Sequence, residues 1–159
     1  MIGYEIENII KTKTTWGVKK LFRGVFSSNN LPKYLPFGQS HTLICNLSPA
    51  QHPGTHWVAM FISNFGELTY FDSFGRPPLN DDIKNFVCNN SLTLIYNKVP
   101  LQGAMTRTCG LYCLYFIIKC CEGLDLPRIL SVFNPFQPEY NDRFILNYFF
   151  EKTFYNALL

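Results

Sequence analysis

The stretch Gln102–Cys121 constrains this chain most, because a polar, glycine-containing loop runs directly into an apolar segment that has no proline. Leu111, Leu114 and Ile118 recur at the three- and four-residue spacing of a helix face. Phe116 fills the opposite side of the same segment. The sequence therefore predicts a helix that is buried on all sides.

Cys109 lies where the polar loop becomes this helix. The first backbone N–H groups of a helix have no internal partner, and the helix dipole places partial positive charge there. A thiol at such a position is biased towards thiolate, the nucleophilic form. Cysteine is also among the residue types most often buried as a small hydrophobe. Taken alone, Cys109 therefore fits either a nucleophile or a packing residue.

The chain has 159 residues, of which 47% are hydrophobic, so it can bury a core and is expected to form a single domain over residues 1–159. The first ten residues contain two acidic side chains and no basic stretch, unlike a signal peptide. The apolar run 111–118 ends at Lys119 and is too short to cross a bilayer. We therefore expect no membrane association.

Neither a disulfide framework nor a metal site is indicated by the cysteine and histidine spacing. The motif His52-x-x-x-His56 contains Pro53 and Gly54, which disfavour the helix that would bring both rings to one side. No C-x-x-C pair occurs, so we expect reduced thiols in a reducing intracellular environment and no required cofactor. The six cysteines are at positions 45, 88, 109, 113, 120 and 121.

Positive charge is concentrated near the start of the chain, where residues 1–33 contain six basic and two acidic side chains. Such a segment can bind DNA or another polyanion. The alternative is an ordinary solvated helix face. The candidate polyanion-binding residues are Lys11, Lys13, Lys19, Lys20 and Arg23.

Periodicity predicts an α+β fold, with a central, mostly antiparallel sheet flanked by helices. The segments 16–26 and 125–138 are ambiguous, and the second fits a connection or a short helix. Asn141 is a candidate cap for the last helix. Helices are expected at 3–13, 79–89, 109–123 and 142–158, and strands at 41–47, 55–63, 67–72 and 91–98.

The two central strands form a hairpin with a specific predicted register. Asn64–Gly66 is a three-residue loop that ends in the glycine such loops favour. Opposed residue numbers then sum to 130, so Val58 faces Asp72 and His56 is its diagonal neighbour. A carboxylate there can orient one imidazole nitrogen and leave the other free to take a proton. His56 and Asp72 thus form the base and orienting group that a Cys109 nucleophile needs.

Four motifs in this order resemble the adenovirus-type maturation protease and, more broadly, the Ulp-type proteases that remove SUMO. The resemblance covers about residues 21–121. Its order of histidine, acid, glutamine and cysteine, and the seven-residue step from Gln102 to Cys109, are the family's. The motifs are Gly54-Thr55-His56-Trp57, Tyr70-Phe71-Asp72-Ser73-Phe74-Gly75, Gln102-Gly103 and Cys109-Gly110-Leu111-Tyr112-Cys113.

The resemblance implies a fold in which Cys109 begins a buried central helix, and it implies a role for each motif residue. Cys109 would attack a peptide carbonyl, His56 would serve as base and then acid, and Asp72 would orient His56. Gln102 and the backbone N–H of Cys109 would stabilise the oxyanion. The family cleaves next to glycine through a narrow cleft.

Two further residues are assigned to that cleft by the resemblance, Trp57 and Gly110, although core packing is an equal alternative for Trp57. Some family members are activated by DNA or by a viral peptide joined through a disulfide. The matching position here is Ser91, so a disulfide-linked activator is not expected. The Gly-Pro-Asn run usual after the glutamine is replaced by Gly103-Ala104-Met105.

The expected function is a monomeric cysteine endopeptidase that cleaves viral capsid precursor proteins during virion maturation. Its location would be the virion and the infected host cell, and DNA would be a partner. One alternative is a deconjugase of ubiquitin-like modifiers, or an acyltransferase, that uses the same triad. An alternative of another class is a non-catalytic protein that binds nucleic acid or virions through the basic segment and the aromatic final helix.

Overall fold

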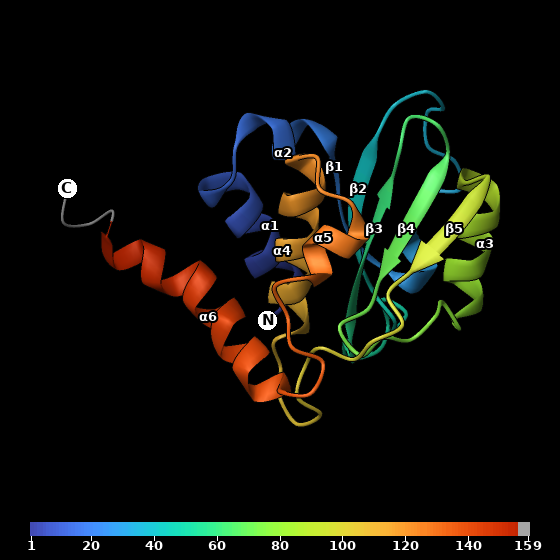
Figure 1. Cartoon of the computed structure of the whole chain (residues 1–159). Helices are drawn as coiled ribbons and strands as arrows, with labels where there is room; N and C mark the ends of the chain where they lie inside the picture. Colours follow the sequence, from blue (N-terminus) through green and yellow to red (C-terminus); the bar gives the residue numbers. More distant parts are fainter. Residues whose placement is uncertain (156–159) are drawn as a thin grey trace.

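A five-stranded sheet lies between helices in the computed structural model, which describes residues 1–155, with side chains to residue 150 (Figure 1). The strands run in the order β1-β2-β3-β4-β5 across the sheet. They are β1 (Phe22–Ser27), β2 (His41–Asn46), β3 (Trp57–Ile62), β4 (Glu67–Phe71) and β5 (Thr93–Tyr96). The helices are α1 (Gly3–Lys13), α2 (Trp16–Leu21), α3 (Asp81–Asn90), α4 (Cys109–Cys121), α5 (Leu126–Leu130) and α6 (Pro138–Tyr155), with a short 3-10 turn at Ser28–Asn30.

The combination of one sheet with several helices confirms the α+β class, and the sheet itself is mixed, with both parallel and antiparallel strand pairs. Both inner pairings, β2 with β3 and β3 with β4, are antiparallel. Both outer pairings, β1 with β2 and β4 with β5, are parallel. A parallel pair needs a crossover connection, and α3 makes the crossover between β4 and β5. The sheet that was expected to be mostly antiparallel is therefore antiparallel in its two inner pairings and parallel in its two outer ones.

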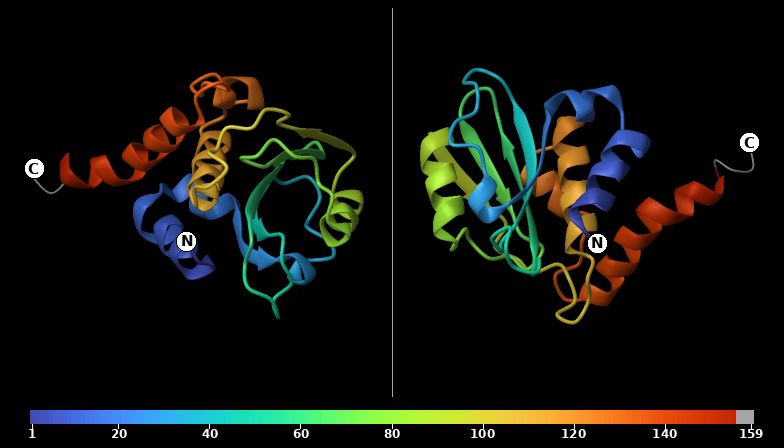
Figure 2. Two further views of the ribbon diagram at one scale, coloured as in Figure 1. Left: turned by 90° about the horizontal axis from the view of Figure 1, so that it is seen from below. Right: turned by 180° about the vertical axis from the view of Figure 1, so that it is seen from behind.

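Helices cover both faces of the sheet. One face packs against α4, with α1, α2 and α5 around it, while α3 covers the other face (Figures 1 and 2). Phe71 of β4 stacks on Phe116 of α4 with ring centroids 4.8 Å apart. On the opposite side, Tyr70 of β4 packs in the same apolar cluster as Phe86 of α3. Alternate residues of one strand thus supply the two cores, as the pleat requires.

The prediction of a buried central helix is confirmed, since every residue from Gly110 to Ile117 is buried. The ambiguous segment 16–26 divides into α2 and β1, and 125–138 contains the short helix α5. The cap prediction for Asn141 is wrong, because α6 begins at Pro138 and places Asn141 inside its first turns. The predicted end of that helix at Leu158 lies outside the described residues.

The final helix α6 leaves the body of the molecule at an angle (Figures 1 and 2). One face of its first turns is buried, with Asn141, Asp142 and Ile145 at most 5% exposed, while Glu139, Tyr140 and Arg143 are exposed. Farther along, Leu146 and Phe150 are partly exposed. Among the described residues, none of the helices has the length and apolar character needed to span a bilayer.

Candidate active site

The β3–β4 hairpin brings His56 and Asp72 together at its open end. Its register pairs Ala59 with Phe71 and Ile62 with Leu68, so paired numbers sum to 130, as the loop length predicted. His56 directly precedes β3 and Asp72 directly follows β4. Their side chains meet in a hydrogen bond of 2.7 Å between Nε2 of His56 and Oδ1 of Asp72. Because Nε2 is engaged, Nδ1 is the nitrogen left to exchange a proton.

Asp72 is fixed by its neighbours on three sides. The backbone N–H of Phe74 donates to Oδ1 of Asp72 over 2.8 Å. The side-chain amide of Asn97, just past β5, forms two hydrogen bonds with the Asp72 backbone. Its Oδ1 accepts from the Asp72 N–H over 3.0 Å, and its Nδ2 donates to the Asp72 carbonyl over 2.6 Å. Asp72 and Asn97 are each 1% exposed. Asn97 therefore ties the β4 end to the β5 end, and the sequence motifs did not identify it.

The turn after Asp72 closes one side of the histidine. The ring of Phe74 stacks on His56 with centroids 4.8 Å apart and an interplanar angle of 27°. Gly75 has φ +69° and donates its N–H to the Asp72 carbonyl over 2.8 Å. A Cβ at this glycine would lie 2.6 Å from the Val99 carbonyl carbon. Only glycine therefore fits this turn against the neighbouring loop, and the turn shields His56 from solvent.

Cys109 begins α4, and its thiol interacts with the His56 imidazole closely enough for each group to shift the pKa of the other. Burial opposes ionisation of the thiol, but hydrogen bonds with His56 and with the backbone of Trp57 and Gly110 lower the pKa of Cys109 below its usual value. Burial also opposes charging of His56, yet its hydrogen bonds with Asp72 and Cys109 raise the pKa of the imidazole to about 9. These shifts favour a thiolate–imidazolium pair, the reactive state of a cysteine nucleophile.

Gln102 is 4% exposed and held by hydrogen bonds at both ends of its amide. Oε1 accepts from the Ser73 hydroxyl over 2.7 Å, and Nε2 donates to the Thr106 carbonyl over 2.8 Å. The Ser73 carbonyl also accepts from the backbone N–H groups of Leu101 and Gln102. Because Ser73 follows Asp72 directly, the same turn that positions the histidine pair also fixes the glutamine.

Trp57 and Gly110 adjoin the thiol through their backbones, while their outer surfaces face Met1. The indole N–H of Trp57 donates to the Met1 carbonyl over 3.1 Å. A Cβ at Gly110 would lie 2.8 Å from the Met1 sulfur and 3.4 Å from Ile6. Trp57 also packs against the core cluster around α4. The packing interpretation of Trp57 thus has structural support, and cleft roles for both residues remain predictions.

The five candidate polyanion-binding side chains are exposed, but they are not equally free. Arg23 donates from Nε to Nδ1 of His41 over 2.7 Å. Lys11 lies 4.0 Å from a carboxylate oxygen of Glu7, and Lys20 lies over the ring of Trp16. Lys13 and Lys19 form no ion pair and no cation–π contact with any of the described residues. The exposed lysines are thus compatible with polyanion binding without demonstrating it.

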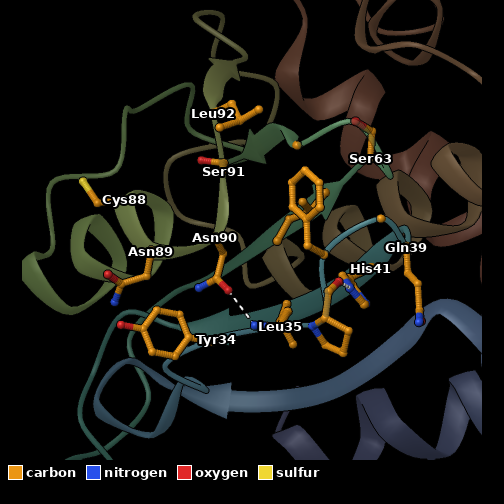
Figure 3. A pocket seen from close by; sticks show the side chains of 15 residues that line it. Tyr34, Leu35, Gln39, His41, Ser63, Cys88, Asn89, Asn90, Ser91 and Leu92 are labelled. Atoms are coloured by element: carbon orange, nitrogen blue, oxygen red, sulfur yellow. Dashed lines mark hydrogen bonds between the residues drawn. The ribbon is translucent and has the colours of Figure 1, made fainter.

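A pocket of about 350 Å³ lies beside the tip of the β3–β4 hairpin (Figure 3). Ser63 and Gly66 of the hairpin loop line it, together with Cys88 and Ser91 near the end of α3. One wall is closed by Asn90, whose Oδ1 accepts from the Leu35 N–H over 2.7 Å. Ser91, the position matched to the activator-linked cysteine, is therefore remote from His56 and Asp72.

No cluster of metal-binding side chains occurs among the described residues.

Sequence comparison identifies viral proteases as relatives of this chain. It is 36% identical over 89 residues to a protein of Acanthamoeba polyphaga mimivirus named "Putative thiol protease", which covers 50% of this chain and 29% of that protein. It is 27% identical over 127 residues to the protease of ovine adenovirus D serotype 7, covering 71% of this chain and 61% of that protein. The predicted similarity to viral cysteine proteases of the adenovirus type is confirmed. The chain spans less than two thirds of either relative's length.

No protein-family model matches the sequence. Among solved structures, the ASFV protease overlaps 66% of this chain and 43% of its own, with 22% identity and a TM-score of 0.43. The SUMO protease Ulp1, with its catalytic cysteine oxidised to a sulfinic acid, overlaps 69% and 53%, with 17% identity and a TM-score of 0.39. Both scores are below 0.5, so the relationship is argued from the sequence matches alone.

Proposed function

We propose that this chain is a cysteine endopeptidase whose nucleophile is Cys109. The proposal depends most on one observation: His56 hydrogen-bonds Asp72 over 2.7 Å and interacts with the Cys109 thiol at the start of α4, in a chain related to viral proteases. The lowered pKa of Cys109 and the raised pKa of His56 supply the charged pair that peptide attack requires.

The chemistry follows from this pair. The Cys109 thiolate attacks the peptide carbonyl carbon, and the carbonyl electron pair moves to oxygen. As the C–N bond breaks, the His56 imidazolium gives its proton to the leaving amine and a thioester remains. His56 then takes a proton from water as that water attacks the thioester. Release of the acid regenerates the thiolate and imidazolium.

Charge on the carbonyl oxygen needs hydrogen-bond donors. Nε2 of Gln102 carries two N–H groups and donates one to Thr106, so the other can face the substrate oxygen. The backbone N–H of Cys109 is the second proposed donor, since it lies at the start of α4, where helical N–H groups lack internal partners. Preorganised donors of this kind contribute about 3–4 kcal/mol each in acyl transfer.

The proposed substrates are viral structural precursor proteins cut next to glycine, in the virion or the infected cell. The viral relatives support this setting. A deconjugase that releases a Gly-Gly-linked modifier uses the same chemistry and is the second candidate, supported by the same triad geometry. No extra cofactor is proposed, and DNA is proposed as an activator through the exposed lysines of α1 and α2.

Incubation with co-encoded capsid proteins, followed by mass spectrometry of new termini, tests the proposal. We expect new termini adjacent to glycine with the wild-type chain and none with Cys109→Ala. A parallel reaction with a SUMO–Gly-Gly conjugate separates the deconjugase alternative. Repeating both at low salt with double-stranded DNA tests activation. Cleavage that persists in Cys109→Ala would contradict the nucleophile assignment.

A further inference from the structure

We propose that Asp142 and Asn141 of α6 are positioning residues that hold the oxyanion loop, residues 101–108. This inference depends on the proposed function of two residues: Gln102, near the start of the loop, and Cys109, directly after its end. The contacts run from the first turns of the last described helix to a segment about 40 residues earlier in the chain.

Asp142 is a buried carboxylate that collects hydrogen bonds from three separate points. Oδ2 accepts from the backbone N–H of Gly103 over 3.0 Å. Oδ1 accepts from the Thr108 hydroxyl over 2.8 Å and from the Tyr112 hydroxyl over 3.1 Å. Among the described residues, no basic side chain forms an ion pair with Asp142. Hydrogen bonds to the loop and to α4 are therefore what compensates its burial.

Two of the three donors lie next to the proposed catalytic groups, and the third, Tyr112, lies in α4 three residues after Cys109. Gly103 follows Gln102, and Thr108 precedes Cys109 and is the N-cap residue of α4. Thr108 makes no side-chain bond to its own helix and instead donates to Asp142. Burial raises the pKa of Tyr112 far above its usual value, and the charge of Asp142 adds to this, so its hydroxyl remains a donor. One carboxylate thus fixes both ends of the loop.

Asn141 holds the loop from the same turn of α6. Its Nδ2 donates to the Leu101 carbonyl over 3.0 Å, one residue before Gln102. The same amide also bonds the N–H and C=O of Asn134, which anchors the connection before α6. The Tyr112 hydroxyl approaches the Leu101 carbonyl at 3.2 Å as well. Leu101, Gly103 and Thr108 are thus all attached to α6, directly around Gln102 and Cys109.

The fit between Asp142 and the loop is tight enough to require glycine at position 103. A Cβ there would lie 2.8 Å from Oδ2 of Asp142 and 3.2 Å from the Thr106 methyl group. Thr106 supplies the carbonyl that accepts from Gln102. A methyl group at position 103 would therefore displace either the carboxylate or the residue that orients the glutamine amide.

The test is Asp142→Asn in the full chain. One amide oxygen cannot accept from Gly103 and also from Thr108 and Tyr112 as two carboxylate oxygens do, and the amide N–H₂ would oppose one of these donors. We expect kcat on a Gly-Gly-aminomethylcoumarin peptide to fall about tenfold to a hundredfold, because displacement of the oxyanion donors acts in the transition state. We expect KM to change less than kcat.

Alkylation of Cys109 by iodoacetamide separates positioning from general damage, because it uses the Cys109–His56 pair but forms no oxyanion. We expect its rate and pH dependence to stay within about twofold of wild type. Asp82→Asn is the matched control, because Asp82 is a carboxylate on α3 that accepts from Ser28 on the far side of the sheet. It should leave both rates unchanged. Gly103→Ala is the second variant and should reproduce the selective loss of kcat.

Amide hydrogen exchange gives a readout that does not need turnover. In Asp142→Asn, exchange over residues 102–108 should accelerate about tenfold or more, while β3 and β4 remain protected. If wild type cleaves no peptide but this acceleration occurs, Asp142 does hold residues 102–108, and it is the proposed function that fails. Unchanged kcat in both variants, unchanged exchange, or a parallel fall in alkylation would overturn the positioning role.

Discussion

The first and second turns of α4 each hold a cysteine, and the two thiols have opposite properties. Cys109 opens the helix, interacts with His56 and has a lowered pKa. Cys113 lies one turn later, is fully buried, and its pKa is raised well above the usual value by burial and then by the charges around it. The same residue type on one helix is therefore made reactive or inert by what faces it.

Position in the helix does not by itself activate the thiol. Burial raises the pKa at both positions, and only at Cys109 do hydrogen bonds with His56 and with the backbone outweigh it. The helix N-terminus contributes because free N–H groups occur in the first turn and not in the second. Activation thus requires the hairpin that delivers His56 as well as the helix that delivers Cys109.

Replacing Cys109 should reduce turnover more than any other change, and replacing Cys113 should not reduce it. Cys109→Ala should lower kcat by about 10⁴-fold or more, because it removes the nucleophile and only a single sulfur atom from the fold. Cys113→Ala is the matched control, and it should keep wild-type kcat within about twofold while losing about 1 kcal/mol of unfolding free energy. Peptide turnover and urea unfolding measure the two effects. Comparable loss of turnover in both variants would show that Cys109 has no special role.

A smaller effect is expected from Asp72→Asn, which keeps an oxygen for the Phe74 N–H but removes the charge. We expect kcat to fall about a hundredfold, since the imidazolium loses its partner. The pH profile sharpens this prediction. In wild type, activity should rise as Cys109 ionises, below its usual pKa, and fall as His56 loses its proton near pH 9.

Without the carboxylate, the pKa of His56 should drop, so the alkaline fall in activity should move below pH 9. The measurement is kcat/KM against pH for both proteins, with Asp82→Asn as the control. An alkaline limb that stays in place would show that Asp72 does not set the charge of His56.

The smallest expected effect comes from Ser73→Ala, which removes the hydroxyl that donates to Gln102 but keeps the backbone carbonyl that holds the loop. We expect kcat to fall about tenfold, because the amide is less well oriented towards the oxyanion. Iodoacetamide labelling of Cys109 should not change. If labelling slows as much as turnover, Ser73 acts on the thiol rather than on Gln102.

The sequence predicted the part of the site that local geometry determines. A three-residue loop with glycine at its end fixed the hairpin register, and the register placed His56 beside Asp72. The polar-to-apolar switch placed Cys109 at the helix start. These features depend only on loop length and on periodicity over a few residues. Both can be determined from a single sequence.

The parts that were missed depend on contacts between distant segments. Asn97 reaches Asp72 across 25 residues, and Asp142 reaches Gly103 across 39. No spacing rule indicates such partners. The start of α6 did have a local signal, because proline favours the first turn of a helix, and Pro138 is a better start than Asn141. Whether an edge strand is parallel or antiparallel depends on how the chain crosses over to reach it. Hydrophobic periodicity contains no information about this connection.

The β3–β4 hairpin has a practical consequence for engineering. Strand β3 lies between His56 and the Asn64–Gly66 tip, and its six residues extend about 20 Å at roughly 3.3 Å per residue. Phe65 at that tip is 80% exposed. A reporter domain or affinity label grafted there would leave the paired strands in register. A single-residue deletion inside β3 would instead rotate the imidazole to the wrong side of the sheet.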